Sequence, residues 1–289
     1  MRVTNGMIVN TSLNGLYNNM NRLNKTYAQM TTGKKIQTVS DDPIIAGRAL
    51  KLKTTVLETT QYESNTKEAM SWMEVSEAAL KNMTEILKEI RTKCVQGATG
   101  TYEAEDLKVI QTQIGQLWKQ LQEEANTTYG DRYIFSGYKT NQPLVENGVI
   151  NANLAHTNDD SIEYEIGVKS TIDVNVKGMY NFLTDVEGLI NGLATGKTDD
   201  FSNAIKQLDD VILKDLSQKT SDLGSRMSRV EYTQHRLIDH KTTFKNLLTN
   251  TEDVDIEETY TTFTTQYAAY QSALQATSKI ITNTLADYL

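Results

Sequence analysis

The side chains that most often carry out chemistry are few in this chain of 289 residues, and their spacing does not suit a reaction centre. The chain has three histidines and one cysteine, Cys94. His235 and His240 are five residues apart, so on a helix they point to different faces, unlike the i and i+4 pair of a helical zinc site. Cys94 falls on an apolar helical position, which favours a buried packing residue over a nucleophile.

Two short segments could in principle bind an ion or a phosphate. The segment TNDD at 157–160 lacks the twelve-residue pattern of a calcium loop. The segment ATGKTDD at 194–200 lacks the first glycine of a phosphate-binding loop and follows no hydrophobic strand. We therefore predict that the protein is not an enzyme and has no catalytic residues, no cofactor and no metal site.

The composition excludes some classes of partner. The formal net charge of −8 argues against a general nucleic-acid binder, whose surface is basic. No run of 18 apolar residues predicts a transmembrane helix, and the N-terminus lacks the apolar core of a secretory signal. One cysteine also cannot form a disulfide within the chain. We expect neither nucleic acid nor membrane as a partner.

Both ends of the chain carry apolar residues at alternating spacings of three and four, which predicts amphipathic helices with a heptad seam. Such helices are marginal when isolated in water, so each seam needs a partner. We predict that the seams form an assembly interface. Its candidate residues are Val9, Leu13, Leu16, Met20, Leu23, Tyr27 and Met30 near the N-terminus, and Tyr260, Phe263, Tyr267, Tyr270, Leu274, Ile281 and Leu285 near the C-terminus.

The two ends also carry opposite charges. Residues 1–60 contain eight basic and three acidic residues, whereas residues 250–289 contain one basic and six acidic residues. Opposite charge beside apolar seams favours pairing of the two ends, within one subunit or between subunits.

The segment between the ends predicts further helices and a β-rich insertion. Apolar stripes of helical period occupy residues 73–94, 107–121 and 205–247, whereas residues 133–178 alternate with the period of strands. The predicted fold is mainly α, a long antiparallel helical bundle or coiled coil built from both chain ends, with a small β-rich insertion domain in the middle. The expected parts are an N-terminal assembly helix (1–42), core helices (43–132), a β-rich module (133–178), core helices (179–250) and a C-terminal assembly helix that pairs with the first (251–289).

A helix break separates the first assembly helix from the core helices. Gly33 is typical of the residue that follows a helix, and Lys34 and Lys35 would suit the negative end of the helix dipole. Asp41 and Asp42 would suit the start of the next helix, with Asp42 as its cap and Pro43 in its first turn. We predict that Gly33, Asp41, Asp42 and Pro43 fix this break.

Four segments, taken together, resemble the flagellin superfamily. The first is MTTGKKIQTVSDDPIIAGRAL at 30–50, which is similar to the N-terminal signature of that superfamily. The others are DRYIFSGYKTNQPLV at 131–145, DLGSRMSRVE at 222–231 and the C-terminal helix at 253–289, which ends in ADYL. IFSGYKT, SDDP and ADYL resemble the branch that joins hook to filament more than the filament subunit. Arg226 and Arg229 are candidates for subunit contacts or for exposed surface residues.

The resemblance implies a structural protein of the bacterial flagellum. Such a protein would be exported without a cleaved signal and would lie outside the cell. It would assemble with copies of itself into a ring or tube, and its partners would be the first hook-associated protein, flagellin and an export chaperone bound to the C-terminal helix.

Two other functions remain open at this point. The first is a short flagellin, the filament subunit itself, which would polymerise by itself. The second is a cytoplasmic coiled-coil scaffold or signalling protein, which would need no β insertion.

Overall fold

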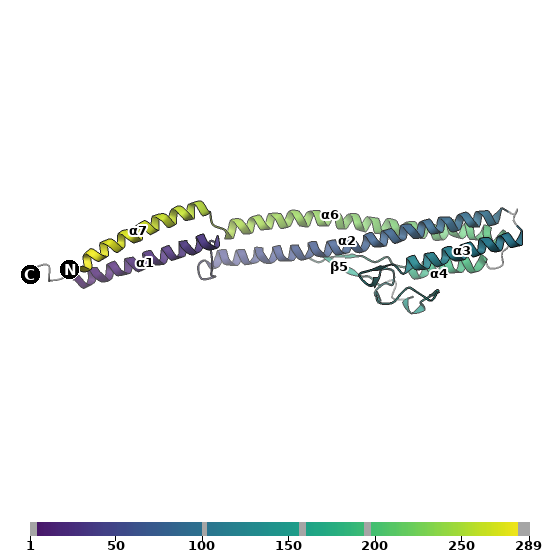
Figure 1. The fold of residues 1–289 in the computed structure, drawn as a ribbon, viewed down its shortest axis with the longest axis horizontal. Coiled ribbons are helices and arrows are strands. Elements are labelled where there is room, and N and C mark those ends of the chain that lie inside the picture. Colours follow the sequence, from purple (N-terminus) through teal and green to yellow (C-terminus); the bar gives the residue numbers. More distant parts are fainter. Residues whose placement is uncertain (1–4, 100–102, 156–159, 194–197, 283–289) are drawn as a thin grey trace, which may run out of the picture. The chain divides into compact units, whose positions relative to one another are not determined.

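The computed structural model describes residues 5–99, 103–155, 160–193 and 198–282. Long helices occupy both ends of this part of the chain, and short strands lie in the middle (Figure 1). The helices are α1 (Asn5–Thr32), α2 (Pro43–Ala98), α3 (Ala104–Ala125), α4 (Met179–Gly192), α5 (Thr198–Gln207), the π-helical turn η3 (Leu208–Ile212), α6 (Leu213–Glu252) and α7 (Ile256–Thr282). The predicted class, mainly helical with a small β-containing middle, is confirmed.

The chain divides into two compact units. The terminal unit comprises residues 1–58 and 241–289, and the central unit comprises residues 59–240. Both divisions fall inside helices, within α2 and within α6. Of the described residues, no helix is long and apolar enough to span a membrane.

The hydrophobic core belongs to the central unit. All of the buried apolar side chains found in the described residues lie between Ala69 and Leu237. The core side of α2 includes Trp72, Met73, Leu80 and Leu87. Cys94 continues this side, is fully buried, and its burial raises the pKa of the thiol to about 11. The thiol is therefore protonated at neutral pH, as expected of a packing residue.

Three antiparallel hairpins form the β-containing part. They pair β1 (Thr128–Tyr129) with β2 (Arg132–Tyr133), β3 (Val145–Glu146) with β4 (Val149–Ile150), and β5 (Glu163–Gly167) with β6 (Ser170–Asp173). The turn between β3 and β4 is Asn147-Gly148, and both residues have positive φ, as a two-residue hairpin turn requires. The first hairpin begins at Thr128, ahead of the expected start at 133, because Gly130 and Asp131 already form a tight turn after α3.

Two asparagines, half-buried Asn126 and fully buried Asn175, fix the loops around these hairpins. The side chain of Asn126 accepts a hydrogen bond from the Val145 amide at 3.0 Å and donates one to the Val145 carbonyl at 2.7 Å. The side chain of Asn175 accepts from the Ile162 amide at 3.0 Å and donates to the Asp160 carbonyl at 2.7 Å. Each side chain thus replaces a strand partner for backbone groups that would otherwise be left unsatisfied.

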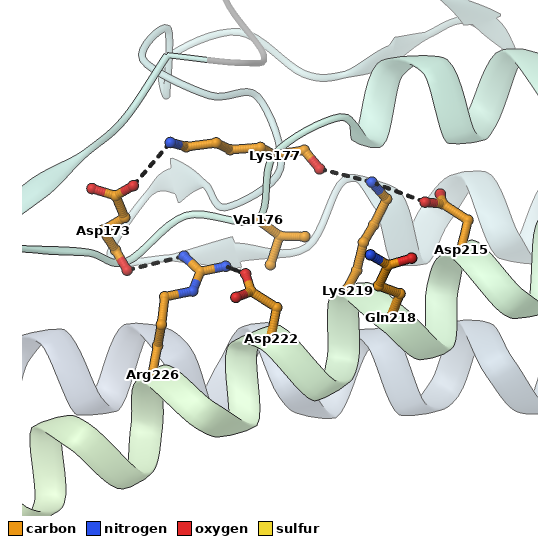
Figure 2. Close-up of a pocket in the computed structure, with 8 residues that line it drawn as sticks. All are labelled: Asp173, Val176, Lys177, Asp215, Gln218, Lys219, Asp222 and Arg226. Carbon is orange, nitrogen blue, oxygen red and sulfur yellow. Dashed lines mark hydrogen bonds and ion pairs between the residues drawn. The ribbon is translucent and has the colours of Figure 1, made fainter.

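A charged pocket lies between α6 and the segment that runs from the end of β6 to Lys177 (Figure 2). Arg226 donates to the carbonyl oxygens of Asp173 and Asn175, at 3.1 and 2.9 Å, and to the Asp222 carboxylate at 2.6 Å. Lys219 donates to the carbonyl oxygen of Lys177 at 3.0 Å. The Arg226 guanidinium thus holds the chain's own backbone, and a role in subunit contacts stays a prediction.

Gly97 in the last turn of α2 allows close packing against Phe201, which is fully buried in α5. A β-carbon at position 97 would lie 2.8 Å from the nearest ring atom of Phe201. We expect Gly97→Ala to lower the free energy of unfolding of the central unit by about 1–3 kcal/mol because the ring must move. Urea denaturation followed by circular dichroism measures this change.

Gly115→Ala is the matched control. Gly115 lies inside α3, and no heavy atom within 4 Å would meet an added β-carbon there. This variant should be more stable than the wild type by about 0.5–1 kcal/mol, since alanine favours a helix interior. Equal effects of the two substitutions would contradict the packing role of Gly97.

Asp173 makes the stability of the central unit depend on pH. Its carboxylate accepts hydrogen bonds from Lys177 at 2.8 Å and from Ser161 at 3.2 Å, and the bond from Lys177 is the main reason that its pKa lies below the usual value. A carboxylate whose pKa is lowered in the folded state stabilises the fold above about pH 4. This contribution is lost as the pH falls further and the carboxylate is protonated. We expect wild-type stability to fall more steeply between about pH 5 and pH 3 than that of Asp173→Asn.

Lys177→Met tests the same pair from the other side. It removes the ammonium group and leaves the backbone carbonyl that Lys219 contacts. Its urea denaturation curves should also depend less on pH than those of the wild type. Parallel pH profiles for the wild type and both variants would show that the pair contributes nothing.

Candidate assembly surface

Within the terminal unit, α1 and α7 lie side by side (Figure 1). The Thr26 hydroxyl, buried at this contact, donates a hydrogen bond to the Gln266 side chain at 2.8 Å. The rings of Tyr27 and Phe263 lie 6.1 Å apart, in the range of an aromatic pair. The two ends of the described chain therefore contact each other within one subunit.

The candidate seam residues fall into two groups in this structure. The first group is half-buried and forms the paired face: Val9, Leu13, Leu16, Leu23 and Met30 on α1, with Phe263 and Tyr270 on α7. The second group stays more exposed along the edge of the paired face, which we call the open face: Met20, Tyr27, Tyr260, Tyr267 and Leu274, with 40–58% of each residue's surface accessible. Of these, Tyr27 keeps its ring contact with Phe263. The side chain of Ile281 and all of Leu285 lie outside the described residues.

Sequence reasoning missed the polar members of the paired face. Thr26, Thr259 and Gln266 are buried or half-buried there. The signal was their spacing, because 259, 263, 266 and 270 also follow a heptad pattern. A search for apolar residues alone does not find polar residues at these positions.

Further apolar side chains on the two helices are exposed. Met7, Ile8 and Tyr17 on α1 and Ile256 at the start of α7 expose 40–62% of their surface. Together with the exposed group above, they leave apolar surface exposed on both helices of the described terminal unit.

The terminal unit buries very little of itself. Among the side chains described there, residues 6–58 and 241–279, the buried ones are threonines: Thr26, Thr259 and Thr277. A pair of helices is hard to stabilise without a buried apolar core, since most helical stability in proteins comes from tertiary packing. Exposed apolar faces of this extent usually mark surfaces that bind other molecules.

A backbone clasp joins the start of the helix break to the segment between α6 and α7. The clasp consists of residues 33–35 and 252–254. The Lys35 amide donates to the Glu252 carbonyl at 2.6 Å, and the Val254 amide donates to the Gly33 carbonyl at 3.0 Å. Lys34 lies at its centre, with its Nζ 2.6 Å from Asp253 Oδ1 and 3.5 Å from Glu252 Oε1.

Both lysines that follow α1 take part in the clasp. The hydrogen bond to Asp253 is the main cause that raises the pKa of Lys34, and the charge of Glu252 adds to it. Lys35 Nζ donates to the Asn250 carbonyl at 3.3 Å. Both lysine side chains therefore contact the 250–253 segment. The favourable effect of the α1 dipole on these two lysines stays a prediction.

The predicted break residues occupy four distinct positions. Gly33 follows α1 with a φ of +70°, a conformation that glycine adopts without strain. Asp42 accepts hydrogen bonds from the Ile44 and Ile45 amides, both at 3.0 Å, and Pro43 is the first residue of α2. This is the arrangement of a helix cap.

Asp41 stabilises the loop and not the helix start. Its carboxylate accepts hydrogen bonds from the Gln37 and Thr38 amides and lies 3.5 Å from Lys25 Nζ. The bond from the Thr38 amide is the largest cause that lowers the pKa of Asp41. Asp41 thus holds the loop in a compact turn beside α1.

Similar geometry occurs in solved flagellar proteins. A FlgL from Bacillus cereus superposes with a TM-score of 0.59 at 16% identity, covering 69% of this chain and 99% of that one. A flagellar hook-associated protein 3 from Legionella pneumophila superposes with a TM-score of 0.58 at 14% identity, covering 69% of this chain and 98% of that one. At such identities the likeness concerns the fold.

Sequence relatives fall into two groups. Flagellar hook-associated protein 3 of Escherichia coli (strain K12) is 34% identical over 141 residues, which is 48% of this chain and 44% of that protein. The chain therefore matches less than half the length of that relative. Flagellin FlaB1 of Treponema pallidum is 23% identical over 215 residues, covering 73% of this chain and 72% of that protein.

Two family models match most of the chain. The model of the bacterial flagellin N-terminal helical region matches residues 3–140, and that of the bacterial flagellin C-terminal helical region matches residues 205–289. These ranges contain α1, α7, the clasp and most of the central helices. The chain belongs to the bacterial flagellin family.

Proposed function

We propose that this chain is a structural component of the bacterial flagellum that joins the hook to the flagellin filament. The observation that carries the proposal is the terminal unit, whose helices pair through half-buried residues and leave an apolar face open. The similarity to a flagellar hook-associated protein 3 over 141 residues supports the junction role. The proposed partners are further copies of this chain, the first hook-associated protein and flagellin.

The energetics of the terminal unit favour assembly. Burial of about six exposed apolar side chains at ~1.5–3 kcal/mol each would stabilise the helices against neighbours, before the cost of ordering them is subtracted. The basic N-terminal region and the acidic C-terminal region can attract each other between copies as well as within one. Contacts between different surfaces of identical subunits build rings or tubes.

Location and export belong to the same proposal. The chain would reach the outside of the cell through the flagellar export apparatus without a cleaved signal, with a chaperone on α7 before export. An exposed apolar face on α7 is a surface that such a chaperone could cover. A structural role of this kind requires no catalysis.

A filament subunit is the second candidate. Flagellin FlaB1 matches a larger share of this chain than the hook-associated relative does. The two functions differ in self-assembly: a filament subunit forms long filaments from purified protein, and a junction protein does not. Electron microscopy of the concentrated, purified chain distinguishes them.

Deletion of the gene in its own host tests the junction role. We expect cells that keep hooks, lack filaments and release flagellin into the medium, since flagellin would have no surface on which to assemble. Electron microscopy of the cells and immunoblotting of the medium measure this, and a plasmid copy should restore filaments. Intact filaments after deletion would contradict the proposal.

The paired face and the open face predict different failures on substitution. Leu16 is half-buried on the paired face, so Leu16→Glu should weaken the contact of α1 with α7 as well as incorporation. Leu274 is 42% exposed, so Leu274→Glu should leave the pairing intact and still block incorporation. Motility in soft agar, together with circular dichroism of the purified variants, separates the two effects.

Ser272→Glu is the control for Leu274→Glu. Ser272 is exposed on the side of α7 opposite Leu274. Its replacement by glutamate introduces the same charge on the same helix. Cells with this variant should swim as the wild type does. Normal filaments in cells with Leu274→Glu would show that the open face is not an assembly surface.

A further inference from the structure

A hollow of about 280 Å³ lies beside the helix break in the terminal unit, and we call it the loop hollow. Its volume is below the range of about 300–1,000 Å³ usual for small-molecule sites, and it suits one or two large side chains better than a ligand. Its lining is mainly apolar: Ile36, Val39, Pro43, Ala46, Gly47, Ala49 and Leu50, with Gln37, Thr38, Lys53 and Glu252.

The loop hollow is open to solvent although its walls are apolar. Val39 and Leu50 expose 70% and 68% of their surface. The local structure holds them in place, because Asp41 fixes the loop on one side and Asp42 caps α2 on the other. A hollow with fixed walls can accept an apolar side chain without reorganising, which favours binding.

The charges around the loop hollow select an acidic partner. Lys53 lines the hollow, and residues 1–60, which supply most of the lining, carry eight basic and three acidic side chains. Glu252, the acidic residue of the lining, lies 3.5 Å from Lys34 in the clasp. A basic side chain, Lys53, thus borders the apolar hollow.

The start of α7 has the complementary character. Ile256 and Tyr260 are four residues apart, so they share one face of the helix, and they expose 62% and 58% of their surface. Glu257 and Glu258 are exposed beside them. The segment therefore presents two apolar side chains flanked by acids.

The same chain cannot readily fill its own hollow with these residues. The Val254 amide is bound to the Gly33 carbonyl, and Asp255 caps α7 through the Glu257 and Glu258 amides at 3.0 and 3.2 Å. These bonds fix the start of α7 with Ile256 and Tyr260 exposed. The same bonds in another copy hold its Ile256 and Tyr260 exposed, where the hollow of a neighbour can contact them.

We propose that the loop hollow of one copy binds Ile256 and Tyr260 of a second copy, with Glu257 of the second copy facing Lys53 of the first. This inference rests on the proposed function, since it names one contact by which the chain would assemble. The two surfaces differ, so the contact is heterologous and each copy can bind a neighbour on both sides.

Cysteine cross-linking in isolated flagella tests the contact. One tagged chain carries Leu50→Cys, a second carries Tyr260→Cys, and both are made in cells that also contain the wild-type chain. Cys94 is fully buried and does not compete. A mild oxidant should give a disulfide-linked dimer of the two variants, and Gly47→Cys with Ile256→Cys should give another.

Leu57→Cys is the matched control for Leu50→Cys. Leu57 is similarly exposed, at 64%, but lies two helical turns further along α2 and does not line the hollow. Disulfides require α-carbons within about 7 Å, so Leu57→Cys should give at least ~tenfold less cross-link with Tyr260→Cys. Equal yields from positions 50 and 57 would overturn the proposal.

A charge exchange tests the role of Lys53. Lys53→Glu and Glu257→Lys should each lower the yield of the Leu50–Tyr260 cross-link, and the double variant should restore it to within about twofold. Lys245→Glu, which changes the same charge on exposed α6, should have no effect. No recovery in the double variant would overturn the pairing of Lys53 with Glu257.

The outcomes separate this inference from the proposed function. If particles that contain the variants give neither cross-link, a second copy does not occupy the loop hollow. A cross-link to a different protein would contradict the proposal in the same way. The yield is scored in whichever flagellar fraction holds the chain. A location in the filament would therefore contradict the junction role and still leave the contact measurable.

Discussion

Two helices in contact can cover only one side of each other, and this constraint governs the ends of the chain. In the terminal unit, α1 and α7 pair through half-buried side chains, and the described residues supply no third element to cover the remaining faces. The buried positions are threonines, which contribute little apolar area. Further burial must come from other molecules, and this requirement links the helical pattern to assembly.

The central unit has the opposite character. It buries its apolar side chains against one another, from Ala69 on α2 to Leu237 on α6. Its polar groups serve the same end, because Arg226 and two asparagines bind backbone groups of the β-containing part. The central unit therefore covers its own apolar side chains, whereas the terminal unit keeps apolar surface available for neighbours.

The clasp and the helix caps fix the positions at which the helices on either side of the break begin. Lys34 and Asp253 join two segments that are more than two hundred residues apart in the sequence, beside the start of α7. Asp42 and Pro43 start α2 on the other side of the break. Because these bonds fix where each helix begins, they also fix which side chains face outward.

The sequence by itself determined the helical class, the heptad pattern of both ends, the cap formed by Asp42 and the burial of Cys94. These depend on local spacing and residue type, which a single chain segment displays. Tertiary structure decided which seam residues are covered, placing Phe263 inward and Tyr267 outward. It also turned Arg226 toward its own backbone and Lys34 toward Asp253. A period in the sequence shows that a helix has an apolar face, but the neighbour that covers it comes from a distant part of the chain, and only the folded structure brings the two together.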